Sequence, residues 1–162
     1  MGSGTGFKKL LPTITITAVC VTAQLTSNTF TFYSQCGAAG HLLYHFSHAN
    51  IFHLALNLIA LFSFVPRTGT CMVAYIAATV ASYLPFMGMD APTCGLSAFV
   101  FAAYARKYYF WRMPVWRLLA ANVALALVPW FNWKIHISAF LLSYFMWMAY
   151  DYLRVFAHER RA

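Results

Sequence analysis

Six mostly apolar stretches follow one another along the chain, with shorter polar segments between them. They cover residues 10–25, 49–65, 71–87, 96–105, 115–131 and 135–153. A membrane-spanning helix needs about 17–25 mainly apolar residues, and every stretch except the fourth comes close to that length. The pattern predicts an all-α membrane protein, a six-transmembrane-helix bundle with a short central fourth helix.

Composition favours the same fold class, because 62% of the residues are hydrophobic and only 9% are charged. A soluble globular domain has about 25% charged residues. We therefore expect a cytoplasmic N-terminal tail over residues 1–9, a six-helix membrane domain over 10–153 and a basic cytoplasmic C-terminal tail over 154–162.

The basic residues predict an orientation for this bundle. With the N-terminus inside, ten of the eleven lysines and arginines fall on the inner side and only Lys134 falls outside. The positive-inside rule then places both termini in the cytoplasm of a multi-pass protein, most simply in the inner (cell) membrane of a bacterium. The basic residues form no stripe on an amphipathic element, so nucleic acid is not an expected partner.

The first stretch follows Lys8 and Lys9 and loosely resembles a cleaved signal peptide, although its length favours a retained helix. The segment 26–47 carries no charged residue but several aromatic ones, and we expect a loop that packs on the bundle at the headgroup level. Cys36 and Cys94 would lie on the same outer side. A disulfide is open to them, and free thiols are the favoured interpretation.

The short fourth stretch indicates a cavity. Its ten residues rise only about 15 Å as a helix, half of the hydrocarbon thickness, so extended backbone over 88–95 must cover the rest. Such backbone is tolerated beside protein or water. Gly95 permits a close approach there, and Ser97 would lie at the cavity floor at a helix N-terminus. This segment alone leaves two roles open for Ser97, a nucleophile or a helix N-cap.

Polar side chains within the other stretches point to the same region. His53 and Asn57 are four residues apart and share one helix face, whereas His48 faces elsewhere. His136 begins the sixth stretch.

Small residues predict how closely the fourth and sixth stretches pack. Ala139 and Ser143 follow His136, and Ala98 and Ala102 follow Ser97. Ridges of small residues let two helices approach, which would bring His136 to hydrogen-bond distance of Ser97.

Three motifs together resemble the rhomboid family of intramembrane serine proteases. The family's HxxxxHxxxN motif matches His48, His53 and Asn57, and its GxSG motif is similar to Gly95-Leu96-Ser97-Ala98. Its HxxGxxxG motif corresponds to 136–143, with Ala139 and Ser143 in place of glycines. The Gly-Leu-Ser sequence also resembles the rhombosortase branch.

This resemblance implies a serine endopeptidase that cleaves transmembrane segments of membrane proteins near the outer face. Ser97 would be the nucleophile and His136 the general base, in a dyad that forms an acyl-enzyme. His53, Asn57, Gly95 and the Ser97 amide would form the oxyanion and substrate-binding site. His48, Phe101, Ala98, Ala139 and Ser143 would support it. Neither a metal nor a cofactor is expected; the expected partners are transmembrane substrates and the lipid bilayer, and the oligomeric state stays open.

Two alternatives remain. The first is a non-catalytic rhomboid-fold protein that binds transmembrane helices. The second is a membrane metalloprotein that uses His41, His45 and His48, whose spacing suits one helix face, although no HExxH motif is present.

Overall fold

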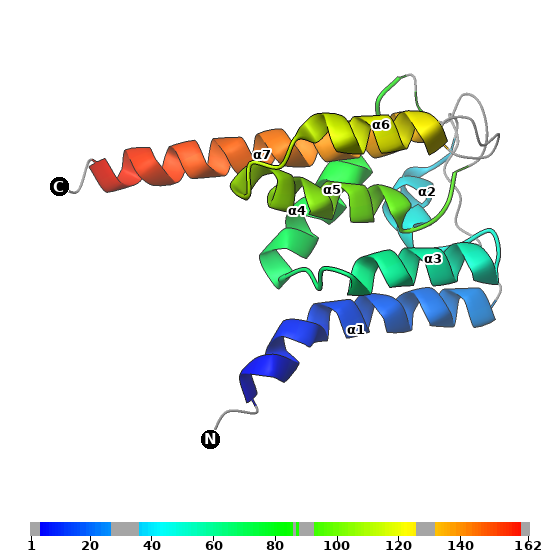
Figure 1. Cartoon of the computed structure of the whole chain (residues 1–162). Helices are drawn as coiled ribbons and strands as arrows, with labels where there is room; N and C mark the ends of the chain where they lie inside the picture. Colours follow the sequence, from blue (N-terminus) through cyan, green and yellow to red (C-terminus); the bar gives the residue numbers. More distant parts are fainter. Residues whose placement is uncertain (1–3, 27–35, 86, 88–92, 126–131, 160–162) are drawn as a thin grey trace.

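A computed structural model describes residues 4–26, 36–85, 87, 93–125 and 132–159. The elements in these ranges are helices, and the longer ones run roughly along one direction (Figure 1). In chain order they are α1 (Gly4–Leu25), α2 (Ala38–Leu43), the 3-10 helix η1 (Tyr44–Phe46), α3 (Ile51–Phe62), α4 (Thr68–Ser82), α5 (Ser97–Phe110), α6 (Val115–Leu125) and α7 (Trp133–Glu159).

The helix lengths correct the predicted fold class. Within the described ranges, no helix has both the length and the apolar character needed to cross a bilayer. The prediction of a six-transmembrane-helix membrane protein is therefore wrong, and so is the multi-pass location in a bacterial inner membrane. The assignment of both termini to the cytoplasm depended on those spans and falls with them.

The physical reason is that several helices are shorter than the apolar stretches that they overlap, because part of each stretch forms turns. The helices α3, α4 and α5 contain 12, 15 and 14 residues, so they rise about 18, 22 and 21 Å, against about 30 Å for a hydrocarbon core. The helices α1 and α7 are longer, with 22 and 27 residues. However, α1 begins at Gly4 in a polar segment, and α7 contains Lys134, Asp151 and Arg154.

Side chains and backbone geometry explain two helix boundaries. At the start of α3, the Asn50 side chain accepts a hydrogen bond from the His53 amide at 2.9 Å and thereby caps the helix. After α3 the chain turns at Val65, whose φ of +42° is uncommon for a β-branched residue, and Pro66 follows. The apolar stretch 49–65 is thus a 12-residue helix with a turn at its end.

The core lies between α4, α5 and α7, which pack directly on one another. Their facing positions are small, so the helix axes can approach closely. The buried members are Ala74, Ala77, Ala78 and Ala81 on α4, Ala98 and Ala102 on α5, and Ala139 and Ser143 on α7. Close packing between the helix that carries Ala98 and Ala102 and the helix that carries Ala139 and Ser143 was predicted from the sequence, and α5 and α7 do pack on each other with these four residues buried.

Around this core, α3 packs on α5 and α1 packs on α3, so α1 and α3 form the lower layer in Figure 1. The helix α6 runs beside α7, and the C-terminal half of α7 extends beyond the bundle. The start of α1 and the end of α7 lie toward one end of the molecule, and α2 lies toward the other (Figure 1). The helices α1 and α7 include parts of the segments predicted as tails, residues 1–9 and 154–162.

The segment predicted as an outer loop contains α2 and η1 in its described part, 36–47, while 27–35 lies outside the described residues. Tyr44 and His45 are fully buried, and the Tyr44 hydroxyl donates a 3.0 Å hydrogen bond to the Ala78 carbonyl. The described part of this segment therefore packs on the bundle, and its short helices were missed because one or two turns carry no clear periodicity.

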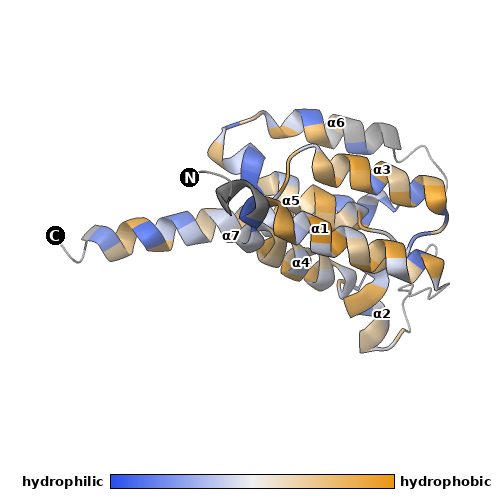
Figure 2. Cartoon of the chain, turned by 90° about the horizontal axis from the view of Figure 1, so that it is seen from below, coloured by the Kyte–Doolittle hydropathy of each residue, from blue (hydrophilic) through white to orange (hydrophobic). Residues whose placement is uncertain are grey.

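Large apolar side chains are exposed on several helices, and orange, the colour of hydrophobic residues, covers much of α1, α3 and α5 in Figure 2. On α3, Phe52 is 78% exposed, and Leu56 and Ile59 are each 67% exposed. An exposed apolar face of this kind marks a surface suited to an apolar ligand or partner.

Candidate active site

Ser97 and His136 lie in direct contact. Ser97 is the first residue of α5, and His136 lies in the first turn of α7. The His136 Nε2 atom is 2.7 Å from the Ser97 Oγ atom, a hydrogen-bond distance. Ser97 is partly exposed, whereas His136 is 3% exposed. The structure thus puts a partly exposed serine hydroxyl in contact with a buried imidazole, as the predicted roles of nucleophile and base require.

Ser97 does not act as a helix N-cap. The N-cap of α5 is Leu96, and the helix begins with Ser97 itself. The amides of the first turn have no partner within an α-helix, so the Ser97 N–H group points out of the end of α5. Of the two roles that the sequence left open, this placement favours the nucleophile.

The aromatic ring of Phe101 packs against the imidazole. The two ring centroids are 4.8 Å apart with an interplanar angle of 36°. Phe101 lies one turn after Ser97 on α5, so one helix carries both the serine and the ring that packs on His136.

The carboxylates of α7 lie far from this pair. Asp151 and Glu159 follow His136 by 15 and 23 residues on the same helix, about 22 and 35 Å along its axis. The Asp151 carboxylate accepts a hydrogen bond from the Tyr109 hydroxyl at 3.2 Å. Asp90 lies outside the described residues. The described arrangement is a dyad.

Gly95 brings His53 and Asn57 to the segment before Ser97. Its φ of +112° lies in a region that L side chains rarely adopt. A Cβ atom at this position would be 2.5 Å from His53 Cε1, 2.8 Å from His53 Nε2 and 3.5 Å from Asn57 Nδ2. Both side chains predicted to line an oxyanion site therefore face the backbone two residues before the nucleophile.

Two further hydrogen bonds hold this segment in place. The Gly95 amide donates to the Tyr44 carbonyl at 2.9 Å, and the Leu96 amide donates to His48 Nε2 at 3.3 Å. The His48 and His53 rings also contact each other, with centroids 5.2 Å apart. His48, which the resemblance implies to be a supporting residue, thus bonds to the backbone next to Ser97.

Electrostatics favour the neutral form of both histidines at the site. Burial lowers the pKa of His136, and His53 lowers it further by a smaller amount. Burial also lowers the pKa of His53. A neutral His136 imidazole has a free lone pair on one nitrogen, which a general base requires.

Comparisons with known proteins found neither a protein-family model nor a curated protein that matches this chain. The resemblance to rhomboids therefore stays a prediction from the three motifs, and the site is interpreted from its geometry.

Asn132 is a component of the site that the sequence analysis missed. Its Nδ2 atom donates to Thr93 Oγ1 at 2.8 Å, and its Oδ1 atom accepts from the Ile135 amide at 3.4 Å. It thereby connects the segment before Ser97 to the start of α7. Asn132 directly precedes α7 and accepts a hydrogen bond from the amide three residues on, as an N-cap asparagine does, and an asparagine before an apolar stretch was the available signal.

Three histidines of the metalloprotein alternative have separate partners. His41 Nδ1 contacts Ser82 Oγ at 2.9 Å, His45 Nε2 contacts Thr79 Oγ1 at 3.1 Å, and His48 binds the Leu96 amide. Their rings do not converge on one point. Cys36 and Cys94 are free thiols, as the favoured interpretation held.

Proposed function

We propose that this chain is a serine endopeptidase with a rhomboid-like Ser97–His136 dyad. The observation that carries the proposal is the 2.7 Å contact between His136 Nε2 and Ser97 Oγ at the start of α5. The approach of His53 and Asn57 to Gly95 supports it, because it puts polar groups beside the nucleophile.

In the proposed reaction, His136 takes the proton of the Ser97 hydroxyl as the oxygen attacks a peptide carbonyl. The tetrahedral intermediate collapses when the C–N bond breaks, and His136 gives its proton to the leaving amine. An acyl-enzyme remains on Ser97. A water molecule then attacks the ester, with His136 again as the base, which releases the acid product and restores the serine.

The oxyanion of both intermediates needs donors that are already in position. The Ser97 amide is one, since it lies in the first turn of α5. The Asn57 side-chain amide is a second, and its Nδ2 atom also donates to the His53 carbonyl at 3.1 Å. A protonated ring nitrogen of His53 is the third.

The proposed substrate is an apolar polypeptide segment in an extended conformation. An intact helix covers its own peptide bonds, so the scissile bond must be unwound to reach Ser97. Phe52 and Leu56 are exposed on α3 next to His53 and Asn57, which favours apolar side chains in the segment. Cleavage of transmembrane segments, which the resemblance implies, is not part of the proposed function.

A non-catalytic binding protein is the alternative that shares this fold. It has no need of a nucleophile in contact with a base, so the dyad geometry favours the enzyme. The two functions differ in one measurable property, the reactivity of Ser97.

The test is labelling with a fluorophosphonate probe, followed by identification of the labelled residue. We expect labelling of Ser97 in the wild type, none at this position in Ser97→Ala, and a rate reduced by about 10³-fold or more in His136→Ala. Ser138→Ala serves as the matched control on α7. Equal labelling of wild type and His136→Ala would refute the dyad, and a wild type without labelling at Ser97 would favour the binding protein.

A further inference from the structure

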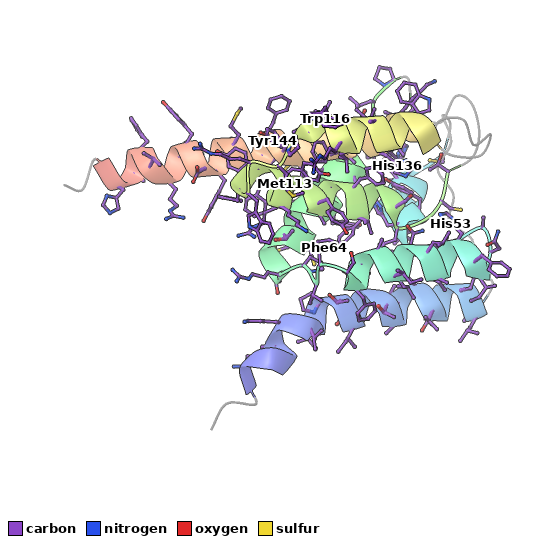
Figure 3. All side chains as sticks on the ribbon, viewed as in Figure 1. His53, Phe64, Met113, Trp116, His136 and Tyr144 are labelled. Atoms are coloured by element: carbon purple, nitrogen blue, oxygen red, sulfur yellow. The ribbon has the colours of Figure 1, made fainter. Side chains whose placement is uncertain are left out.

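A cavity of about 360 Å³ lies at the end of α5 away from Ser97. It lies between the turn after α3, the start of α4 and the last turns of α5. Its lining residues are Ser63, Phe64, Val65, Pro66, Arg67, Thr70, Ala103, Arg106, Lys107 and Trp111. Figure 3 shows Phe64, which lines the cavity, well away from His53 and His136 at the dyad. The cavity is therefore separate from the proposed active site.

Its charges are of one sign. Arg67, Arg106 and Lys107 line it, and no carboxylate is found among the described lining residues. Aromatic rings hold two of these cations: the Arg106 guanidinium lies 5.0 Å from the Phe110 centroid, and Lys107 Nζ lies 5.2 Å from that of Trp111. A cation on a ring face keeps its full charge, so the cavity stays positive.

The N-terminus of α4 adds a partial positive charge to the cavity. The helix begins at Thr68, and its N-cap Arg67 makes no side-chain capping hydrogen bond. The first amides of α4 thus have no partner within the helix and can bind an anion. Thr70, only 5% exposed, brings a hydroxyl group to the same cavity.

Helix stabilisation explains the positions of Arg106 and Lys107 but not that of Arg67. Arg106 and Lys107 lie in the last turns of α5, where cations stabilise the negative end of a helix. Arg67 precedes α4, where a cation is unfavourable because the helix end is itself positive. An anion in the cavity would offset this repulsion and the mutual repulsion of the three side chains.

We propose that this cavity binds a phosphate group, either of a small soluble phosphate compound or of a phospholipid headgroup. Arg67, Arg106 and Lys107 are lining residues of the cavity, and together with the first amides of α4 they offer donor types suited to a tetrahedral oxyanion. A volume of about 360 Å³ exceeds a single phosphate ion and is in the range of small-molecule pockets. The cavity therefore has room for an organic group beside the phosphate.

The first arm of the test measures binding in solution. Inorganic phosphate and glycerol 3-phosphate are titrated into the full chain at constant ionic strength set with chloride. Tryptophan fluorescence and the unfolding temperature are followed, because a ligand that binds only the folded state raises that temperature. We expect both compounds to raise it more than chloride does, and glycerol 3-phosphate to bind more tightly.

The second arm distinguishes the source of the phosphate. Binding to phosphatidylglycerol vesicles is compared with binding to phosphatidylcholine vesicles. Stronger binding to phosphatidylglycerol that is lost in Arg67→Gln assigns the headgroup, whereas soluble-phosphate binding without this preference assigns a soluble compound.

The variants decide whether the cavity is responsible. Losing one charged donor should weaken phosphate binding by about tenfold or more in Arg67→Gln and Lys107→Gln. Arg117→Gln is the matched control, since Arg117 lies outside the cavity over the Trp116 ring. In phosphate-free buffer, Arg67→Gln should also unfold at a higher temperature than wild type. The proposal is refuted if no phosphate compound binds better than chloride, or if the control loses as much affinity as Arg67→Gln.

Discussion

Replacing Gly95 with alanine is the most direct test of how the site is assembled. The added Cβ atom would be 2.5 Å from His53 Cε1, a separation that folded proteins do not tolerate, so the His53 ring must move. The φ of +112° adds backbone strain of about 1–3 kcal/mol. For a chain of 162 residues, that strain corresponds to a fall of about 2–12 °C in the unfolding temperature.

The effect on activity should be larger than the effect on stability. Loss of one oxyanion donor lowers turnover by about 10²–10³-fold, and a displaced His53 is such a loss. The assay combines thermal unfolding with the rate of fluorophosphonate labelling and the cleavage of an apolar fluorogenic peptide. Gly69→Ala is the matched control, because a Cβ atom there has nothing within 4 Å and the residue lies in α4.

We expect the control to unfold at or slightly above the wild-type temperature and to keep full activity. A Gly95→Ala variant that unfolds at the wild-type temperature and cleaves at the wild-type rate would refute the reasoning. It would show that His53 does not face the segment before Ser97.

Four further substitutions test individual contacts. Asn57→Ala should lower turnover by about 10²-fold with little change in KM, and an unchanged turnover would assign Asn57 to packing. Phe101→Ala should slow labelling of Ser97 by loosening His136, and Phe101→Tyr should restore it; labelling of the alanine variant at the wild-type rate would remove the ring from the mechanism. Ala139→Leu should cost about 1–3 kcal/mol of unfolding free energy and abolish most labelling, since a shift of about 1 Å can cost 10²-fold in rate; a folded variant with full labelling would contradict close packing of α5 and α7. Asn132→Ala should lower turnover, and Asn132→Asp, which can still cap α7, should recover the unfolding temperature more than the turnover; equal recovery of both would indicate a capping role alone.

The local chemistry of the site could be predicted from the sequence because it depends on short spacings. His53 and Asn57 are one helical turn apart, so any helix over that segment puts them on one face. The small residues of α5 and α7 predicted close packing, and His136 at the head of one ridge then meets Ser97 at the head of the other.

The fold class could not be predicted in the same way, because apolar content does not reveal where a helix ends. Residues 49–65 are mostly apolar, yet α3 ends at Phe62 and Val65 has a positive φ. The high apolar content of this stretch does not indicate such a turn. The contact between Asn132 and Thr93 was missed because neither residue belongs to the three motifs that led to Ser97 and His136, and no local period connects residues 39 positions apart.

Ser97 is synthesised well before His136, so the two residues of the dyad cannot meet until late in the synthesis of the chain. Ser97 and His136 are 39 residues apart, and the base is on α7. At a synthesis rate of about 5–20 residues per second, the serine leaves the ribosome about 2–8 seconds before the histidine. During that interval Ser97 is an ordinary alcohol without a base. If the proposed mechanism holds, the nascent chain cannot cleave itself or its neighbours until α7 has been made and has packed against α5.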